Sequence, residues 1–297
     1  MNDILNLKFY SGKDLYSDGD IEDELLDIVS KYDDYSEVLK KDDRWPILYH
    51  LSPIRHNLLQ WYDFKENATI LEIGAGCGAI TGCLCEKAKK VTCVELSKRR
   101  STINATRNKK YNNFEIMVGN FEDVVIEEKF DYVTLIGVLE YAPSYIKSDN
   151  PFNEMLDRIK GYLKPDGKVI IAIENRFGIK YFSGAAEDHT GRLFDGINGY
   201  IDVSSVRTFS KKELKELLSN VGFVNQEFYY PLPDYKMPNV VYSDYHLPKR
   251  GELSNMAYSY DRDRFGFFNE NIVNDCFCDA GIMDFFANSF LVIGDMG

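Results

Sequence analysis

The residues best suited to hold a cofactor lie in segment 68–85. An apolar run there is followed by one glutamate and three glycines, Glu72, Gly74, Gly76 and Gly78. Closely spaced glycines after a strand let the backbone turn sharply and let a ligand approach where a Cβ atom would collide. The segment predicts a loop that binds a nucleotide-type cofactor. By itself the pattern is ambiguous, because Ala79 completes a G-x-G-x-x-A dinucleotide motif.

Charge helps to separate these two interpretations. A pyrophosphate is anionic and prefers helix N-terminal amides without carboxylates nearby, whereas S-adenosylmethionine carries a sulfonium and an ammonium group. Glu72, two residues before the first glycine, suits the cationic molecule. Glu95 ends the next predicted strand and can accept hydrogen bonds from ribose hydroxyls. That role serves NAD and S-adenosylmethionine equally.

Four segments follow one another in a familiar order and spacing: "LEIGAGCGAITG", "VTCVELS", "VGNFEDV" and "FDYVTLIGVLEYAP". They resemble the successive motifs of class I S-adenosylmethionine-dependent methyltransferases over about residues 66–175. The resemblance implies that the glutamate-glycine motif of segment 72–78 contacts the methionine part of the cofactor. It also implies that Glu95 binds the ribose.

The later motifs add further cofactor residues. The family's third motif usually ends in an aspartate that faces the adenine amino group, and Asn120 stands there in this sequence. An amide oxygen also accepts a hydrogen bond, and Phe121 is a candidate to pack on the adenine ring. The fourth motif places Glu140 near the transferred methyl group.

A finer resemblance rests on "WPILYHLSPIRHNLLQWY", "IENRFGIKYFSGAAEDHTGRLFDGI", "YYPLPDYKMPNVVYSD" and "ANSFLVIG". Together they are similar to a bacterial branch of methyltransferases associated with cell-surface polysaccharide biosynthesis. Members of that branch are sometimes joined to glycosyltransferase domains. The resemblance implies a glycan or other polar small-molecule acceptor, and a glycosyltransferase as partner or fused domain.

Methyl transfer to a hydroxyl group requires alignment of donor and acceptor and removal of a proton. His189 and Asp188, in a glycine-flanked polar loop, are the candidate bases. An imidazole titrates in the useful range, although His189 could equally order its loop. Glu174 and Arg176 are candidate positioning groups. With a base present the reaction needs no metal, and we expect none.

The site requires a sheet that brings strand ends together, and the pattern predicts one. Helix-like patterns alternate with seven predicted strands, at 69–74, 91–95, 114–118, 131–136, 168–174, 223–230 and 288–294. Predicted helices fall at 78–88, 97–108, 152–163 and 211–220. This alternation is typical of a doubly wound, mostly parallel α/β sheet with a Rossmann-like methyltransferase fold.

We expect the chain to have two parts, which meet at residue 66. Residues 1–65 form a helical segment, with an acidic amphipathic helix near 21–29 and a second helix entered through Ser52 and Pro53. Residues 66–297 form the methyltransferase domain. Insertions at about 175–210 and 231–287 are rich in aromatic residues and follow strand ends. We assign them to a substrate-facing cap, with packing of a small second core as the alternative.

Composition excludes several classes of protein. The 297 residues carry 35 Lys and Arg against 47 Asp and Glu, a net charge of −12, and 44% are hydrophobic. Such a chain folds as a globule and repels phosphate backbones, so we expect no nucleic-acid partner. The basic runs 98–100 and 107–110 fit a solvated helix face. The six cysteines lack C-x2-C spacing, and no apolar run approaches a membrane span, which favours a cytoplasmic protein.

The preferred function is S-adenosylmethionine-dependent methylation of an oxygen, or secondarily a nitrogen, on a polar small molecule or glycan unit. One alternative is an NAD-dependent oxidoreductase or epimerase, although no Tyr-x-x-x-Lys pair follows the fourth strand. The other is a non-catalytic scaffold that keeps the cofactor fold. The oligomeric state and the acceptor are not evident from the sequence.

Overall fold

The structure is a computed structural model that describes residues 4–257 and 264–297. The chain divides into two compact units. The first contains the residues up to Leu135 together with Gly161–Lys168, and the second contains Ile136–Lys160 and the residues from Val169 onward. Each unit is described by itself.

The first unit holds a parallel sheet. Its strands are β1 (Leu5–Asn6), β2 (Thr69–Ile73), β3 (Lys90–Glu95), β4 (Phe114–Val118) and β5 (Phe130–Ile136, of which the last residue belongs to the second unit). They lie in the order β1-β4-β3-β2-β5, and every pair is parallel. The four strands expected here are confirmed. Because strand order reverses beside β2, ligand binding is favoured at the carboxyl end of that strand.

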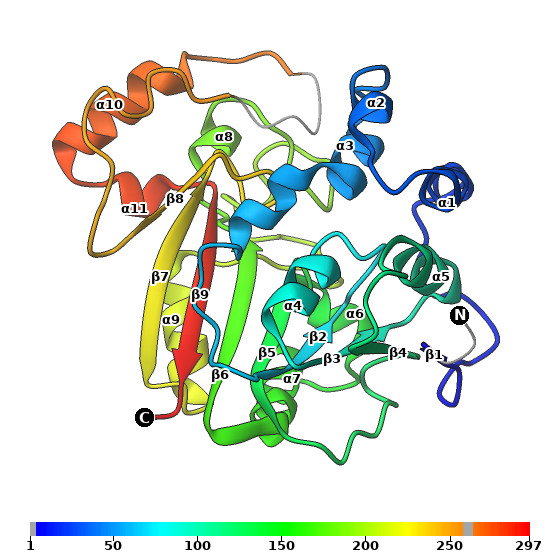
Figure 1. Cartoon of the computed structure of the whole chain (residues 1–297). Coiled ribbons are helices and arrows are strands. Elements are labelled where there is room, and N and C mark those ends of the chain that lie inside the picture. Colours follow the sequence, from blue (N-terminus) through cyan, green and yellow to red (C-terminus); the bar gives the residue numbers. More distant parts are fainter. Residues whose placement is uncertain (1–3, 258–263) are drawn as a thin grey trace. The chain divides into compact units, whose positions relative to one another are not determined.

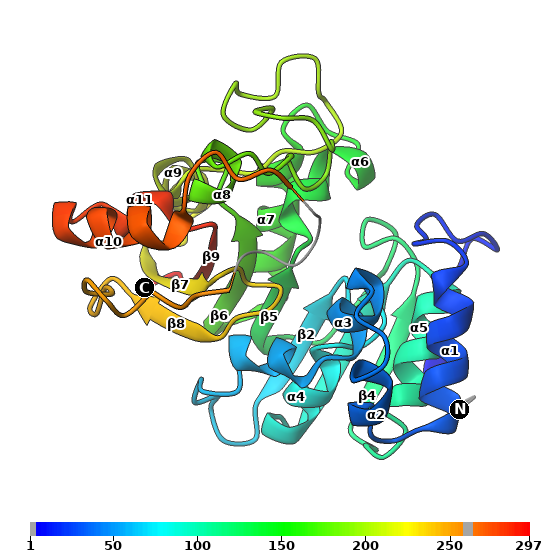
Figure 2. The same cartoon turned by 90° about the horizontal axis from the view of Figure 1, so that it is seen from above.

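The described part of the first unit contains α5 (Lys98–Arg107) and five further helical segments. They are α1 (Ile21–Lys31), α2 (Ser36–Leu39), α3 (Trp45–Leu51), η1 (Pro53–Leu58) and α4 (Thr81–Lys87). Leu25 and Val29 of α1 share a buried cluster with Ile103 of α5, and the two helices lie side by side in Figures 1 and 2. The predicted acidic helix is therefore confirmed.

The second unit is built on antiparallel pairing. Its strands are β6 (Leu163–Glu174, from Val169 in this unit), β7 (Asn225–Leu232), β8 (Val240–Ser243) and β9 (Ser289–Asp295). The order is β6-β9-β7-β8, with β9 antiparallel to both of its neighbours and β8 antiparallel to β7 (Figure 1). Its helices are η2 (Leu139–Tyr141), α6 (Ala142–Tyr145), α7 (Pro151–Tyr162, of which the last two residues belong to the first unit), α8 (Ile179–Phe182), α9 (Lys211–Asn220), α10 (Glu270–Ala280) and α11 (Met283–Phe286).

The seven-stranded description needs two corrections. In the described residues the strands number nine, because β1 and β8 were not expected. A two-residue strand gives no alternation to detect, and β8 lies in the second insertion as the return arm of a hairpin with β7. The sheet is also less parallel than predicted. Burial patterns set a strand's two faces but carry no information about its direction.

The aromatic residues of the two insertions divide between core and surface. Tyr181, Tyr200, Tyr230 and Tyr235 are each at most 5% exposed. Phe182 and Tyr245, in contrast, are exposed. The buried tyrosines pack inside the second unit, and the assignment of the insertions to a substrate-facing cap stays a prediction.

No described helix combines the length and the apolar character that crossing a bilayer requires.

Candidate functional site

The glycine-rich loop follows β2 and adopts a conformation that only glycine tolerates well. Gly74, Gly76 and Gly78 have φ values of 72°, 55° and 78°. These angles lie in the left-handed region, where a Cβ atom is strained. A Cβ atom at Gly78 would stand 2.4 Å from Oδ1 of Asn104. The three glycines are thus explained by backbone geometry and close packing on α5.

Glu72 is buried beneath this loop. Its carboxylate accepts hydrogen bonds from Thr81 Oγ1 at 2.6 Å and from Cys93 Sγ at 3.4 Å. Burial raises the pKa of Glu72 to about 7, more than these hydrogen bonds lower it. The residue is a buried acid whose charge is costly unless a cation comes close.

Glu95, at the end of β3, is hydrogen-bonded to the glycine loop. Its side chain accepts the Gly76 amide at 2.8 Å and the Ser97 amide at 2.9 Å. Each carboxylate oxygen can accept two hydrogen bonds, so capacity for ribose hydroxyls is left. The side chain of Arg100, a residue of α5, reaches the same loop. Its Nη2 would lie 3.0 Å from a Cβ atom placed on Gly76.

Asn120 and Phe121 follow β4. The Asn120 side-chain oxygen accepts the Glu122 amide at 3.4 Å and its carbonyl accepts the Asp123 amide. Phe121 is 6% exposed, with its ring centroid 6.0 Å from that of Tyr162. Phe121 therefore packs within the first unit. Its contact with adenine stays a prediction.

A second cluster lies in the second unit, at the ends of β5 and β6 and in the loop that carries His189. Nε2 of His189 lies 3.6 Å from Glu140 Oε1 and 3.9 Å from Glu174 Oε2. Nδ1 of the same ring lies 2.9 Å from Glu187 Oε1. All four side chains are at most 7% exposed. Three carboxylates thus surround one imidazole.

These carboxylates control the proton of His189. Burial alone would lower the pKa of the imidazole, but the charges of Glu174 and Glu140 and the hydrogen bond to Glu187 hold it well above its usual value. Action as a base, as the sequence predicts, requires a bound group that offsets the carboxylate charge.

Asp188 is engaged in an ion-pair network. Lys180 Nζ lies 2.9 Å from its Oδ2 and Lys236 Nζ lies 2.8 Å from its Oδ1. Although burial opposes ionisation, the two ammonium groups hold the pKa of Asp188 well below its usual value. A carboxylate held in this way is a poor base. Its predicted catalytic role stays untested, and its observed contacts are those of a positioning residue.

The structure thus groups the predicted residues in two sets. The first unit brings together Glu72, the glycines and Glu95, and the second brings together Glu140, Glu174, His189 and Asp188. Arg176 pairs with Glu213 instead, its Nε 2.9 Å from Oε2.

Sequence reasoning missed Glu187, Lys180 and Lys236. Glu187 adjoins two predicted residues and could have been found from that position. The lysines gave no signal, because lysine is almost always exposed and Lys180 is 1% exposed here.

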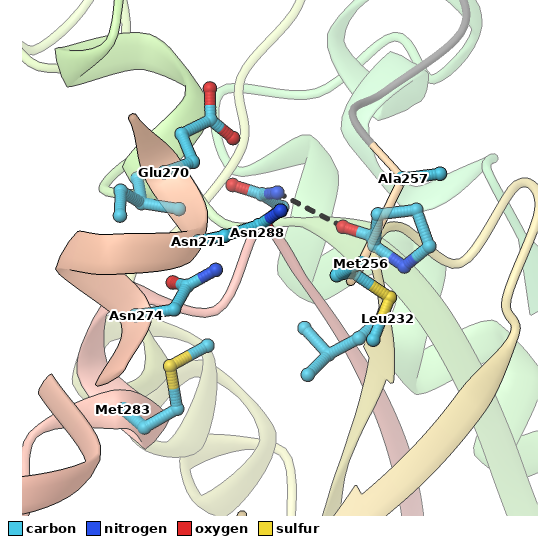
Figure 3. A pocket seen from close by; sticks show the side chains of 10 residues that line it. Leu232, Met256, Ala257, Glu270, Asn271, Asn274, Met283 and Asn288 are labelled. Carbon is cyan, nitrogen blue, oxygen red and sulfur yellow. Dashed lines mark hydrogen bonds between the residues drawn. The ribbon is translucent and has the colours of Figure 1, made fainter. Parts of the chain in front are cut away.

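A separate pocket in the second unit contains none of the predicted residues (Figure 3). Its lining includes Met256, Glu270, Asn274 and Met283. The Asn288 amide, also in the lining, donates to the Pro233 carbonyl at 2.9 Å. The one carboxylate of this lining, Glu270, pairs with Arg264, and the other lining residues are apolar or carry amides, so we do not place the candidate active site here.

Comparisons with curated proteins give partial matches. A ribosomal RNA small subunit methyltransferase A of Fusobacterium nucleatum is 34% identical over 96 residues, which make up 32% of this chain and 35% of that protein. An uncharacterized methyltransferase of Staphylococcus carnosus is 29% identical over 103 residues, 34% of this chain and 45% of that protein. The chain thus spans less than half the length of either relative.

Solved structures agree with the fold. A SAM-dependent methyltransferase of Thermotoga maritima aligns with a TM-score of 0.50 and 17% identity, covering 89% of this chain and 98% of that one. Phosphoethanolamine N-methyltransferase 1 of Haemonchus contortus, solved with phosphoethanolamine and S-adenosylhomocysteine, aligns with a TM-score of 0.50 and 15% identity over 93% of this chain and 48% of that one. The predicted Rossmann-like methyltransferase fold is confirmed.

The sequence profile of a family described as a methyltransferase domain matches residues 47–227, more than half of the chain. That range contains all four motifs on which the resemblance to class I S-adenosylmethionine-dependent methyltransferases rests. The resemblance at this level is confirmed, and the chain belongs to the methyltransferase domain family.

Proposed function

We propose that the chain transfers the methyl group of S-adenosylmethionine to an oxygen of a polar small molecule or glycan unit. The observation that carries the cofactor assignment is the loop of segment 74–78, whose amide at Gly76 is held by Glu95 while Glu72 lies buried beneath it. Two carboxylates beside the glycine loop suit a cationic adenosine derivative better than a pyrophosphate. Family membership and the fold neighbour that holds S-adenosylhomocysteine support the same cofactor.

Two observations support the proposal of an oxygen acceptor: the polar loop of the second unit and the finer resemblance to polysaccharide-associated enzymes. In our proposal Glu140 lies near the transferred methyl group, and His189 takes the hydroxyl proton once bound cationic groups have offset the surrounding carboxylates. A glycosyltransferase is the proposed partner or fused domain.

A nitrogen acceptor is the second candidate, and a charge count favours it. Among the described residues of this cluster, five carboxylates (Glu140, Glu174, Glu187, Asp188 and Asp234) face three basic side chains (Lys180, Lys236 and His189). The excess of negative charge would attract an ammonium group.

Thermal unfolding with added cofactor tests the donor. A ligand at 100 times its dissociation constant stabilises the folded state by about 2.7 kcal/mol. We expect S-adenosylmethionine to raise the Tm and NAD to leave it unchanged. Gly76→Val should abolish the shift, because the side chain is strained at this φ value and its Cβ would stand 3.0 Å from Arg100 Nη2, which distorts the loop. Gly251→Val is the control, because Gly251 also has a positive φ value (88°) but lies exposed with open space around it. A shift with NAD alone would refute the donor assignment.

Release of S-adenosylhomocysteine in the presence of candidate acceptors tests the reaction. The wild-type chain should release it with a hydroxylated glycan unit or with a small amine, and the productive acceptor decides between oxygen and nitrogen. His189→Ala should reduce turnover by about 10²-fold or more if the imidazole is the base. Turnover within a few-fold of wild type would remove His189 from the chemistry.

A further inference from the structure

Three side chains that ligate metals converge in the second unit from separate segments. Glu140 follows β5, Glu174 ends β6, and His189 lies in the following loop. One ligand atom from each lies within 4.8 Å of the other two. Ligands at about 2.1 Å from an ion are separated by about 3.0 to 3.5 Å. The observed separations of 3.6 and 3.9 Å from His189 Nε2 need only a small contraction to meet that geometry.

Two buried oxygens of this cluster have no hydrogen-bond donor. Glu140 Oε2 and Glu174 Oε2 are without a hydrogen-bond partner among the described residues, and the two side chains are 1% and 0% exposed. Buried carboxylate oxygens are almost always satisfied, since an unpaired one costs a large desolvation penalty. Glu174 Oε2 is also the oxygen that faces His189. The unpaired oxygens thus point to a cation that belongs between the three side chains.

The surroundings orient His189 for coordination. Its Nδ1 lies 2.9 Å from Glu187 Oε1, and Glu187 is itself fixed by the amides of His189 and Thr190 at 2.8 and 2.7 Å. A carboxylate on one ring nitrogen fixes the tautomer that directs the other nitrogen's lone pair at a metal. Here that other nitrogen is Nε2, which faces Glu140 and Glu174.

The Glu174 carboxylate is also held on its far side. Lys236 Nζ lies 2.5 Å from Oε1, and the Tyr235 hydroxyl donates to the same oxygen at 3.3 Å. These two donors leave Oε2 as the oxygen available for coordination. Lys236 adds a positive charge nearby, and Asp188 at 2.8 Å balances it.

We propose that Glu140, Glu174 and His189 form a binding site for one divalent transition-metal ion. One imidazole and two carboxylates suit Mn²⁺, Fe²⁺ or Zn²⁺, whereas Mg²⁺ and Ca²⁺ prefer oxygen ligands alone. Three protein ligands leave positions open for water or an acceptor oxygen. The site goes beyond the proposed function, because it requires neither the methyl donor nor a particular acceptor. The two roles of His189 exclude each other at any one moment: with an ion on Nε2 the imidazole is a ligand, and it can act as the base only in the metal-free chain.

Metal binding is measured on the tag-free chain without S-adenosylmethionine. The chain is stripped with a chelator, dialysed against Mn²⁺ or Zn²⁺, and analysed for bound metal. Electron paramagnetic resonance follows Mn²⁺ directly. We expect about one ion per chain, with a spectrum that shows coordinated nitrogen. Absence of retained Mn²⁺ and Zn²⁺ by the wild-type chain would by itself overturn the proposal.

Variants locate the ion. Glu174→Gln and His189→Ala should each weaken binding at least about tenfold, and Glu187→Gln by about 10- to 100-fold through loss of ring orientation. Glu270→Gln is the matched control, because Glu270 is equally buried in the same unit but pairs with Arg264. Circular dichroism verifies folding, and Glu140→Gln replaces any variant that unfolds. If every variant of the three proposed metal ligands bound the ion as tightly as the wild type, the ion would lie elsewhere and the assignment would be refuted. Because the Tm shift with S-adenosylmethionine is a separate measurement, each proposal can fail without the other.

Discussion

At the scale of single residues, Glu72 lowers the stability of the folded chain when no cation is bound beside it. It is 4% exposed, and the hydrogen bond from Thr81 does not offset its burial, so its pKa is about 7 instead of 4.5. The folded chain thus binds this proton more tightly than the unfolded chain does. Stability is lost as the pH rises from about 4.5 to about 7, and the loss is complete above that range. A cationic cofactor would reverse the penalty.

Replacing Glu72 with glutamine tests whether the buried carboxylate lowers stability and, at the same time, supports cofactor binding. Because the amide stays neutral, Glu72→Gln should stabilise the cofactor-free chain at pH 8 by roughly 1–3 kcal/mol and have little effect near pH 5. Binding of S-adenosylmethionine should weaken in the same variant. Urea unfolding at the two pH values and calorimetric titration measure the two effects.

Exposed Glu66→Gln serves as control and should change neither quantity. A loss of stability in Glu72→Gln that is equal at pH 5 and pH 8 would instead show that the carboxylate has a structural role.

The residues of the candidate site differ in how far sequence could reveal them. Glu72, the three glycines and Glu95 lie within or beside adjacent strands, so motif spacing alone brought them together. The cluster around His189 joins segments near residues 140, 174, 187 and 236. No periodicity links such distant positions, and the charge of a buried lysine such as Lys180 contradicts the usual exposure pattern.

At the scale of elements, α9 illustrates a boundary that the sequence encodes fully. Helix 211–220 was predicted, and the structure places α9 at Lys211–Asn220. Ser210 Oγ accepts the Glu213 amide at 3.3 Å, and the Glu213 carboxylate accepts the Ser210 amide at 2.8 Å. This capping box satisfies two donors at the helix start. Strands β1 and β8 lack any comparable local signal, since their existence depends on partners elsewhere in the sheet.

Removal of the cap should destabilise the chain measurably. Ser210→Ala is expected to cost about 1 kcal/mol, or about 2 °C in Tm for a chain of this size. Differential scanning calorimetry measures the change. Ser254→Ala, at an exposed position in the same unit, is the control and should leave the Tm unchanged. Equal shifts in the two variants would argue against the capping role.

At the scale of the whole molecule, the charge of this chain opposes the binding of a polyanion such as the ribosomal RNA named in some of its partial matches. The net charge is −12 over 297 residues. The basic runs near α5 are also neutralised within the first unit. Arg99 pairs with Asp23, Lys109 with Asp33 at 3.0 Å, and Lys110 with Glu86 at 3.8 Å. Polyanion binding depends on unpaired cations that release counterions, and these runs provide few.

We therefore expect no binding of small-subunit ribosomal RNA up to about 10 µM protein at about 0.1 M salt, because the long-range field repels the phosphate backbone. Filter binding across a salt series measures this, and Lys109→Glu combined with Lys110→Glu should behave like the wild type. The opposite result would also have a defined structural meaning. Retention with a dissociation constant below about 1 µM, falling steeply with salt and lost in the double variant, would mean that RNA displaces Asp33 and Glu86 from the two lysines. The acceptor would then be sought among nucleic acids instead of among glycans and small molecules.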